Sequence, residues 1–491
     1  MPRDTAAHPT ARARRGALSL AVLLSAAACT SMVPTYQRPD VAMQAVSFKE
    51  APSTPGWNAA TPADEQARGR WWLPFGDATL NELLPQVEVS NQNVAAAVAR
   101  YAAAQALVAG QQAQLKPQVQ LTASATRSGV GINTSGGVAT TGGVSVSPTV
   151  TTLRAAVNAS WELDVWGRLR AGVEQAQASA QASAADLAGA KLSAQSALAT
   201  AYFNLREADA ELALLRDTVA AYERSLQITD NRYAAGQAAR TDVLQAQTQL
   251  ATTRAQVAAL AIQRQQFEHA IAVLLGKAPA DFALAAAPWT ATVPDIPATL
   301  PSELLQRRPD IASAERAVAA ANAGIGVARA AYYPSLSLGA TAGTSGVRFV
   351  DLFDAANTLW SLGLSLAQVL FDGGALDAAL KNAEASRDVT IATYRQTVLT
   401  SFQSVEDLLV QRRGQSEQLA LLQQASAAAD LTEQQVLNRY RVGQVSYTDV
   451  VTAQTSALTA RRSVVQLQVG LQANAIALVQ ALGGGWSAET H

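Results

Sequence analysis

The sequence predicts a mainly α-helical protein that is built from two copies of one unit and carries a few β-strands suited to a membrane. First, residues 231–247 (NRYAAGQAARTDVLQAQ) match residues 438–454 (NRYRVGQVSYTDVVTAQ) in Asn-Arg-Tyr, Gly-Gln, Thr-Asp-Val and Ala-Gln. Second, the hydrophobic period switches from that of a helix to that of a strand in both copies. Third, no run of 18 or more apolar residues follows residue 28, so any membrane-spanning part must consist of strands.

The N-terminal residues predict export and lipidation. Arg12, Arg14 and Arg15 precede an apolar run over residues 17–28 that ends in small residues, which is typical of a signal peptide, here residues 1–28. Cys29 follows directly and is the one cysteine of the chain. This order resembles a bacterial lipoprotein signal, so we expect Cys29 to be lipidated; an ordinary signal peptide with an incidental cysteine is the alternative. Because Thr30 rather than aspartate follows, the resemblance implies the outer membrane.

The first copy switches period twice. A helical pattern runs from Asp77 to Lys116 and ends before a proline. Apolar and polar residues then alternate in residues 118–126 and 153–164, as expected for strands with one apolar and one polar face. A very long helical segment follows from about Arg168 to Arg232, with heptad-spaced apolar residues that are typical of helix pairs. After a glycine turn, a returning helix covers residues 241–275. The heptad pattern includes Leu212 and Leu215 on the long helix and Leu260 on the returning one.

The second copy repeats this order. A helix is expected over about residues 309–332, strands over residues 335–343 and 359–366, a long helix over about 375–439, and a returning helix over 446–482. The expected division of the chain is therefore a signal peptide (1–28), a lipidated tether (29–76), a first repeat (77–280), a linker or equatorial segment (281–301), a second repeat (302–484) and a short tail (485–491).

Four strands per chain cannot close a barrel, and open sheet edges are not tolerated in lipid. Several chains must therefore contribute to one barrel. Three chains would give twelve strands and twelve helical columns, although the periodicity by itself does not fix that number.

Composition argues against several functional classes. The 37 lysines and arginines balance 38 acidic residues, so no electrostatic footprint points to nucleic acid. One cysteine and three dispersed histidines give no metal-ligand cluster. No nucleophile-base constellation or phosphate loop is visible, so we expect no catalytic residues, no metal and no enzymatic activity.

Several motifs carry a family resemblance over nearly the whole chain past the signal peptide. They are VPTYQRP (33–39), WW..F.D..L (71–80), WELDVWGRLR (161–170), QRRPDI..AE (306–315), ANAGIGVARAAYYPSLSLGATAG (321–343), VLFDGG (369–374) and the two duplicated stretches. In this order they resemble the TolC-like outer-membrane factor family, in its NodT/OprM-type efflux lipoprotein branch.

The resemblance implies a homotrimer with a twelve-stranded transmembrane β-barrel in the outer membrane and a long α-helical coiled-coil tunnel in the periplasm. Two tips per chain then give six near-equivalent hairpins at the tunnel mouth. The implied partners are a periplasmic adaptor (membrane fusion) protein, an inner-membrane efflux transporter and outer-membrane lipid. No cofactor is implied beyond the covalent diacylglycerol and N-acyl (palmitate) lipid on Cys29.

The resemblance also implies a periplasmic gate at the hairpin tips. The residues that match the family pattern are the turn glycines, the acidic gate positions and the gate tyrosines, namely Gly236, Gly443, Asp242, Asp449, Tyr233 and Tyr440. Nearby arginines are candidate bonding partners for the acids at this gate, namely Arg232, Arg439, Arg240 and Arg441. Crowded carboxylates would repel one another and attract cations, and arginine or tyrosine donors would hold them together.

This chain departs from the gate pattern at two positions, and a second interpretation of its acids exists. Val445 stands where some family members have a gating arginine, and Thr452 replaces a second aspartate. Acids in the first turn of a helix also stabilise its dipole without any gating role, and Ser446 and Asp449 have capping-box spacing.

The leading functional hypothesis is a passive exit duct of a resistance-nodulation-division efflux system. The exit duct of a type I protein-secretion system is the alternative in the same class. A non-conducting periplasmic coiled-coil lipoprotein is the alternative from a different class. At the strand-to-helix passages, Trp161, Trp166 and Phe371 are expected either to anchor the protein at the membrane interface or to pack.

Overall fold

The computed structural model describes residues 32–40, 69–129, 149–289, 291–294 and 307–484, so the predicted signal peptide, Cys29 and the C-terminal tail lie outside the described residues. The chain forms two compact units, and each draws on both repeats. The sheet unit consists of Met1–Arg38, Ala103–Ala180 and Arg316–Ala392, and the hairpin unit of Pro39–Ala102, Gln181–Glu315 and Thr393–His491.

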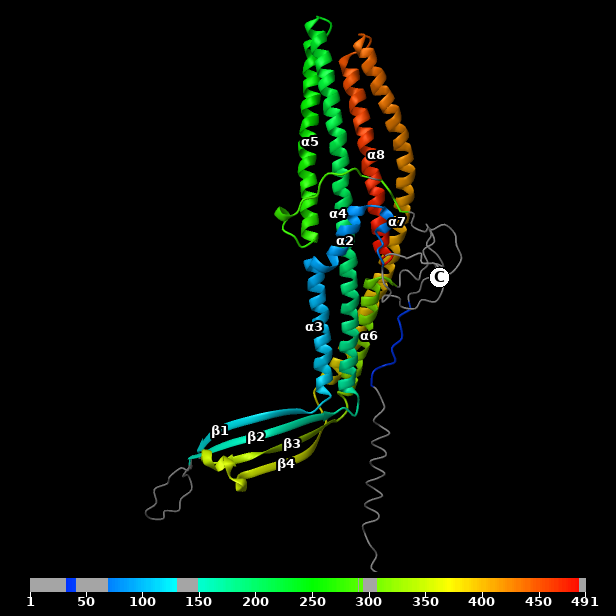
Figure 1. Ribbon diagram of the computed structural model, residues 1–491. Helices are drawn as coiled ribbons and strands as arrows, with labels where there is room; N and C mark the ends of the chain where they lie inside the picture. The colour runs from blue at the N-terminus through cyan, green and yellow to red at the C-terminus, as the bar shows by residue number, and fades with distance from the viewer. Residues whose placement is uncertain (1–31, 41–68, 130–148, 290, 295–306, 485–491) are drawn as a thin grey trace, which may run out of the picture. The chain divides into compact units, whose positions relative to one another are not determined.

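The order of elements repeats as the sequence predicts. Figure 1 shows η1 (Leu73–Phe75), α2 (Ala78–Ser90), α3 (Gln92–Gln114), β1 (Gln118–Gly129), β2 (Thr149–Leu163), α4 (Arg168–Ala234), α5 (Arg240–Leu274), η2 (Pro279–Asp281), α6 (Pro309–Ala330), β3 (Ser335–Gly346), η4 (Phe349–Phe353), η5 (Ala355–Asn357), β4 (Thr358–Ala367), α7 (Ala375–Arg441) and α8 (Tyr447–Ala481). All four predicted strands and both predicted long helices are confirmed.

The sheet unit contains one antiparallel sheet in the order β1-β2-β3-β4. Leu121 pairs with Val157, Val157 with Ala342, and Ala342 with Trp360. Because side chains opposite one another in a sheet lie on the same face, this register gathers the apolar alternation of all four strands on one face. The other face carries mostly serine, threonine, asparagine and glycine.

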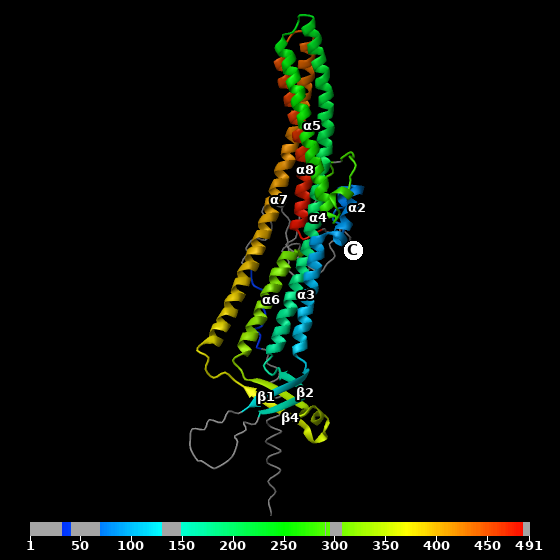
Figure 2. The same cartoon turned by 90° about the vertical axis from the view of Figure 1, so that its left-hand side faces the viewer.

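The hairpin unit contains the two antiparallel helix pairs, α4 with α5 and α7 with α8, which run side by side in Figures 1 and 2. One of its apolar clusters joins Leu212 and Leu215 of α4 to Leu260 of α5 and Leu458 of α8. The first three are positions of the predicted heptad pattern, so the narrow apolar seam of these alanine-rich helices is confirmed as their packing surface.

Among the described helices, α8 is long and apolar enough to cross a membrane, with a mean hydropathy of 1.2 over its most apolar window. Half of that window is buried inside the protein. Leu471, Ile476 and Val479 are among its buried residues. This burial is that of a core helix in the hairpin unit, so the length of α8 is weak evidence for a membrane span.

The prediction of one unbroken helix over residues 77–116 is wrong. The chain leaves the helical conformation at Asn91, with φ −70° and ψ 125°, and α2 and α3 lie on either side. The Asn91 side chain donates to the carbonyl oxygen of Leu274 (2.8 Å) and accepts from the backbone N–H groups of Asn93 and Val94. One side chain therefore caps the start of α3 and the end of α5, a contact 183 residues away in sequence.

Residues 69–76, placed within the predicted tether, pack into the hairpin unit. Trp71, Trp72 and Phe75 are all buried, and the ring of Phe75 lies 5.2 Å from that of Phe203 on α4. Trp71 Nε1 also donates to Gln195 Oε1 (3.1 Å). This aromatic contact fixes the chain ahead of α2 to the long helix.

Candidate functional site

The two hairpin tips end in the same way. Gly236 and Gly443 have φ of +71° and +77°, a left-handed conformation that glycine adopts without a steric penalty. At the first tip, the N–H of Gly236 donates to the carbonyl of Tyr233 (2.9 Å), and the N–H of the next residue donates to that of Arg232 (2.8 Å). The second tip has the same pair of bonds, so the predicted turn role of both glycines is confirmed as a Schellman motif.

Tyr440 of the second tip is buried. Its ring lies 5.3 Å from the ring of Tyr447, and its hydroxyl donates to Thr229 Oγ1 (3.4 Å) on α4. The Tyr447 hydroxyl lies 3.3 Å from Ser225 Oγ, also on α4. Burial raises the pKa of Tyr447, so this phenol stays neutral. The two tyrosines form the core that joins the two hairpins near their tips, together with buried Ala246 and Val450.

Arg232 crosses from the first hairpin to the second. Its Nη1 donates to the carbonyl oxygen of Tyr440, and its guanidinium carbon lies 4.6 Å from the centre of the Tyr440 ring. The structure therefore brings together two predicted gate residues within one chain. A hydrogen bond from a charged donor and a cation–π contact reinforce each other at this point.

The equivalent residues of the other repeat do not meet in this way. Tyr233 is 42% exposed, and Arg240 lies 5.7 Å from the centre of its ring. The Arg439 side chain is exposed and makes no hydrogen bond or ion pair within the described part of the chain. The tip contacts among the predicted gate residues are therefore asymmetric between the repeats.

The two predicted gate aspartates also differ. The Asp449 carboxylate accepts from the N–H (3.0 Å) and the hydroxyl (2.8 Å) of Ser446, and the Ser446 side chain caps α8. The predicted capping box is thus present. At the start of α5 the capping position is Ala239, which has no side-chain acceptor. Half-buried Asp242 makes no side-chain hydrogen bond or ion pair to the described residues.

The sheet provides a second candidate site, its apolar face. Large exposed apolar side chains on this face come from β1, β2 and β4, for example Leu121, Val157, Trp360, Leu362 and Leu364. Leu336 and Leu338 of β3 lie half-buried on the same face. An exposed apolar face of this extent is unsuited to water and suited to lipid.

The predicted interfacial aromatics separate into two kinds. Trp161 donates to the carbonyl oxygen of Leu115 (2.9 Å), and Trp166 donates to that of Pro334 (2.9 Å) while its ring stacks on Tyr333 at 4.8 Å. These two indoles are held by the junctions between helix and strand. Phe371, in contrast, is 91% exposed.

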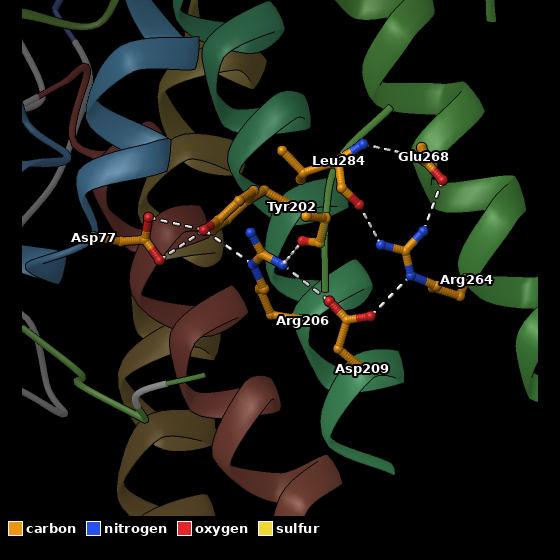
Figure 3. A network of polar contacts seen from close by, with 8 residues as sticks. Asp77, Tyr202, Arg206, Asp209, Arg264, Glu268 and Leu284 are labelled. Atoms are coloured by element: carbon orange, nitrogen blue, oxygen red, sulfur yellow. Dashed lines mark hydrogen bonds and ion pairs between the residues drawn. The ribbon is translucent and has the colours of Figure 1, made fainter. Parts of the chain in front are cut away.

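A buried polar network in the hairpin unit was not predicted. Figure 3 shows it: Asp77 accepts from the Tyr202 hydroxyl (2.7 Å), which accepts from Arg206 Nε (3.1 Å), and Arg206 forms an ion pair with Asp209 (2.9 Å). Burial raises the pKa of Tyr202 to about 12, and the Asp77 carboxylate adds to this rise while Arg206 opposes it.

The same network continues to α5 and to the segment after it. Arg264 forms ion pairs with Asp209 (2.8 Å) and Glu268 (2.7 Å) (Figure 3). Arg264 also donates to the backbone carbonyl of Leu284, and Arg206 donates to that of Ala285. The helical spacing of Tyr202, Arg206 and Asp209 was a signal available in the sequence. These ion pairs have a structural use, since they fix the segment that follows α5 against α4.

Comparison with known proteins places these features in a family. Residues 83–277 and 300–484 match the family model described as outer membrane efflux protein, once for each repeat. The chain is 31% identical over 475 residues, 96% of both chains, to the probable efflux pump outer membrane protein TtgC of Pseudomonas putida. It is 32% identical to the pyoverdine export outer membrane protein OpmQ of Pseudomonas aeruginosa, over 89% of this chain and 92% of that one.

Solved structures agree with these sequence matches. The outer-membrane channel OprN superposes with a TM-score of 0.81 at 30% identity, over 93% of this chain and all of that one. CusC, described as forming a transmembrane channel, gives a TM-score of 0.80 at 28% identity, over 93% of this chain and all of that one. The predicted fold class, a duplicated protomer of a trimeric outer-membrane channel, is confirmed. The chain belongs to the outer membrane efflux protein family and is an efflux channel of the cell outer membrane.

Proposed function

We propose that three copies of this chain form the exit duct of a tripartite efflux system of the resistance-nodulation-division class. The open, two-faced sheet carries this proposal. β1 and β4 are its edge strands, and unpaired edges are costly in lipid unless neighbouring copies pair with them. Three copies place the apolar faces outward and the polar faces around a twelve-stranded lumen.

The first test is electrical. The purified trimer, its stoichiometry established by native mass spectrometry, is inserted into a planar bilayer. Discrete conductance steps are expected. A folded trimer that gives no steps would contradict the duct and favour a structural lipoprotein.

The partners in this proposal are a periplasmic adaptor and an inner-membrane efflux transporter. The relatives are named for different cargoes, toluene, pyoverdine and cations among them, which supports a duct that leaves cargo choice to the transporter. The adaptor binds the hairpin tips, where Val442 is 69% exposed and Arg439 is exposed. A photo-crosslinking residue at Val442 should capture the adaptor in cells, and one at buried Val450 should not.

The gate in this proposal has two parts. Arg232 and Tyr440 tie the two hairpins of each chain together, and three Asp242 carboxylates, one per chain, attract cations at the mouth. Asp449 serves mainly as a helix cap, because Ser446 already holds its carboxylate. Asp242→Asn should therefore lower the cation selectivity of the open channel more than Asp449→Asn does. An equal effect of the two substitutions would contradict this division of roles.

Cys29 carries diacylglycerol and an N-acyl chain in this proposal. The cysteine itself lies outside the described residues, and the support is the segment just after it. Val33 lies against α6, where a Cβ on Gly326 would come within 2.5 Å of Val33 Cγ2, and Asn322 donates to the carbonyl oxygen of Pro34 (2.7 Å). At most three residues, roughly 11 Å of chain, separate Cys29 from this docked segment.

Mass spectrometry of the N-terminal peptide tests the lipid directly. A mass increment for three acyl chains on Cys29 is expected, and it should be absent in Cys29→Ser. An unmodified or absent cysteine in the mature wild-type chain would contradict the proposal.

A further inference from the structure

One charged residue stands apart on the polar face of the sheet. Arg154 of β2 is exposed, and its direct neighbours across the sheet are Ser124 on β1 and Ser345 on β3. Its side chain makes no hydrogen bond or ion pair with the described residues. The other charged side chain on this face of the described strands, Glu162, is bonded by Arg168 at 2.7 Å.

The equivalent residue of the other repeat is uncharged, so this arginine occurs on one of the four strands. The residue 207 positions after Arg154 is Ser361 of β4. Ser361 lies on the same polar face, where it pairs with Thr341 of β3. The connection between β1 and β2, residues 130–148, contains no aspartate, glutamate, lysine or arginine, so it supplies no counter-charge. The connection between β3 and β4 carries an Arg348–Asp351 ion pair (3.1 Å) and Asp354, which bonds the N–H of Ala356.

We infer that Arg154 is a charge-selectivity determinant of the outer part of the duct, where three guanidinium groups, one per chain, favour anionic over cationic solutes. This inference rests on the proposed trimeric duct. It places a cationic ring at the exit, separate from the acidic groups of the hairpin tips.

The dimensions of a twelve-stranded barrel make such a ring effective. Twelve strands spaced about 4.8 Å apart and tilted by about 40° enclose a backbone cylinder of roughly 12 Å radius. An arginine stem carries its charge several ångströms inward, so the charge lies within about one Debye length, roughly 8 Å, of the axis at physiological salt. Three such charges enrich anions at the axis roughly fivefold.

The test is the reversal potential of single channels in a potassium chloride gradient. Arg154→Gln should raise the permeability ratio of potassium to chloride, by up to roughly 25-fold, because the fivefold enrichment of anions and the equal depletion of cations are both lost. Ser361→Arg, which raises the number of cationic groups from three to six, should lower the ratio. An Asp242→Asn background is used for all variants, so that the acidic residues at the mouth do not mask the exit.

Two matched controls come from the same end of the sheet. Arg127→Gln removes the same charge from the opposite, apolar face, since Arg127 pairs with Thr151, which lies on the face opposite Arg154. It should leave the reversal potential unchanged. Asp354→Asn reports on the β3–β4 connection and should shift the ratio less than Arg154→Gln does.

The outcomes separate the two proposals. If the Asp242→Asn channel conducts and the added Arg154→Gln leaves its reversal potential unchanged, the selectivity role is refuted while the duct stands. An equal shift in Arg127→Gln would likewise refute it, because the effect would not depend on the face. If the folded wild-type trimer gives no steps, the duct fails and the inference fails with it.

Discussion

Tyr233 and Tyr440 occupy the same place in the two repeats, yet the first is 42% exposed and the second 2% exposed. Both lie seven residues before the start of the returning helix. There the first repeat has Arg240, which lies over the Tyr233 ring at the surface, and the second has Tyr447, whose ring packs on Tyr440. The tyrosine is therefore exposed in the repeat that has arginine at the start of the returning helix, and buried in the repeat that has a second tyrosine there.

The helix starts differ in the same sense. Ser446 caps α8 and holds Asp449, whereas Ala239 leaves Asp242 without that partner. The two tips therefore share the backbone turn and differ in their side-chain contacts. The second tip packs its tyrosine in the core and caps its returning helix, whereas the first keeps its tyrosine at the surface and leaves Asp242 without a capping partner.

The largest expected effect comes from removing the buried ring. Tyr440→Ala should destabilise the second tip by about 3 kcal/mol or more, because it leaves a cavity beside Tyr447. Tyr233→Ala should cost about 0.5 kcal/mol, as surface substitutions do. Hydrogen exchange of the tip amides measures both, and similar exchange rates in the two variants would contradict the asymmetry.

Breaking the link between the hairpins should have the next largest effect. Arg232→Met removes the charged donor to the Tyr440 carbonyl and should cost about 1.5–3 kcal/mol. The matched variant Arg439→Met, at the equivalent position, should stay within about 0.5 kcal/mol. Faster exchange near Tyr440 and a larger single-channel conductance are expected only for Arg232→Met; the same result for Arg439→Met would show that the link is not specific.

Exchanging the capping residues of the two returning helices should have a smaller effect. Ser446→Ala should destabilise the start of α8 by about 1 kcal/mol and free Asp449. Ala239→Ser should stabilise the start of α5 by a similar amount, because it gives Asp242 the capping partner that Asp449 has. Exchange protection of the first turns of α5 and α8 checks both, with opposite signs expected.

The smallest expected effect is on the pH dependence of stability, and it concerns Glu207 of α4, whose equivalent on α7 is Gly414. Burial, reinforced by the Glu211 carboxylate and opposed by Arg462, raises the pKa of Glu207 to about 7. The folded chain therefore binds more protons than the unfolded chain between about pH 4.5 and 7, so this group lowers stability as pH rises through that window.

Glu207→Gln should remove this decline, with a gain of about 1 kcal/mol or less at pH 8 once solvent screening of the half-buried carboxyl is allowed for. Thermal unfolding from pH 4.5 to 8 measures it. The control is Glu417→Gln on the exposed side of α7, and a decline that persists in Glu207→Gln would assign the pH dependence to another group.

The helices and strands could be predicted from the sequence, because the patterns that indicate them are local. The two-residue and helical periods of the apolar residues located all four strands and both long helices. The two hairpin turns were indicated by glycine, the residue that most readily adopts the positive φ found there. The spacing of Ser446 and Asp449 indicated the capping box. The gate, lipid and adaptor roles remain predictions.

Contacts between distant residues were decided by the tertiary structure alone. Asn91 breaks a continuous helical pattern because its side chain reaches a carbonyl at the end of α5. Arg232 reaches Tyr440 of the other hairpin, whereas no hydrogen bond joins the Arg439 side chain to Tyr233 in the described part of the chain. Tyr202, Arg206 and Asp209 form one buried network with Arg264. Such choices depend on which side chains packing brings within hydrogen-bond distance, and the periodicity of a single segment carries no information about its partner.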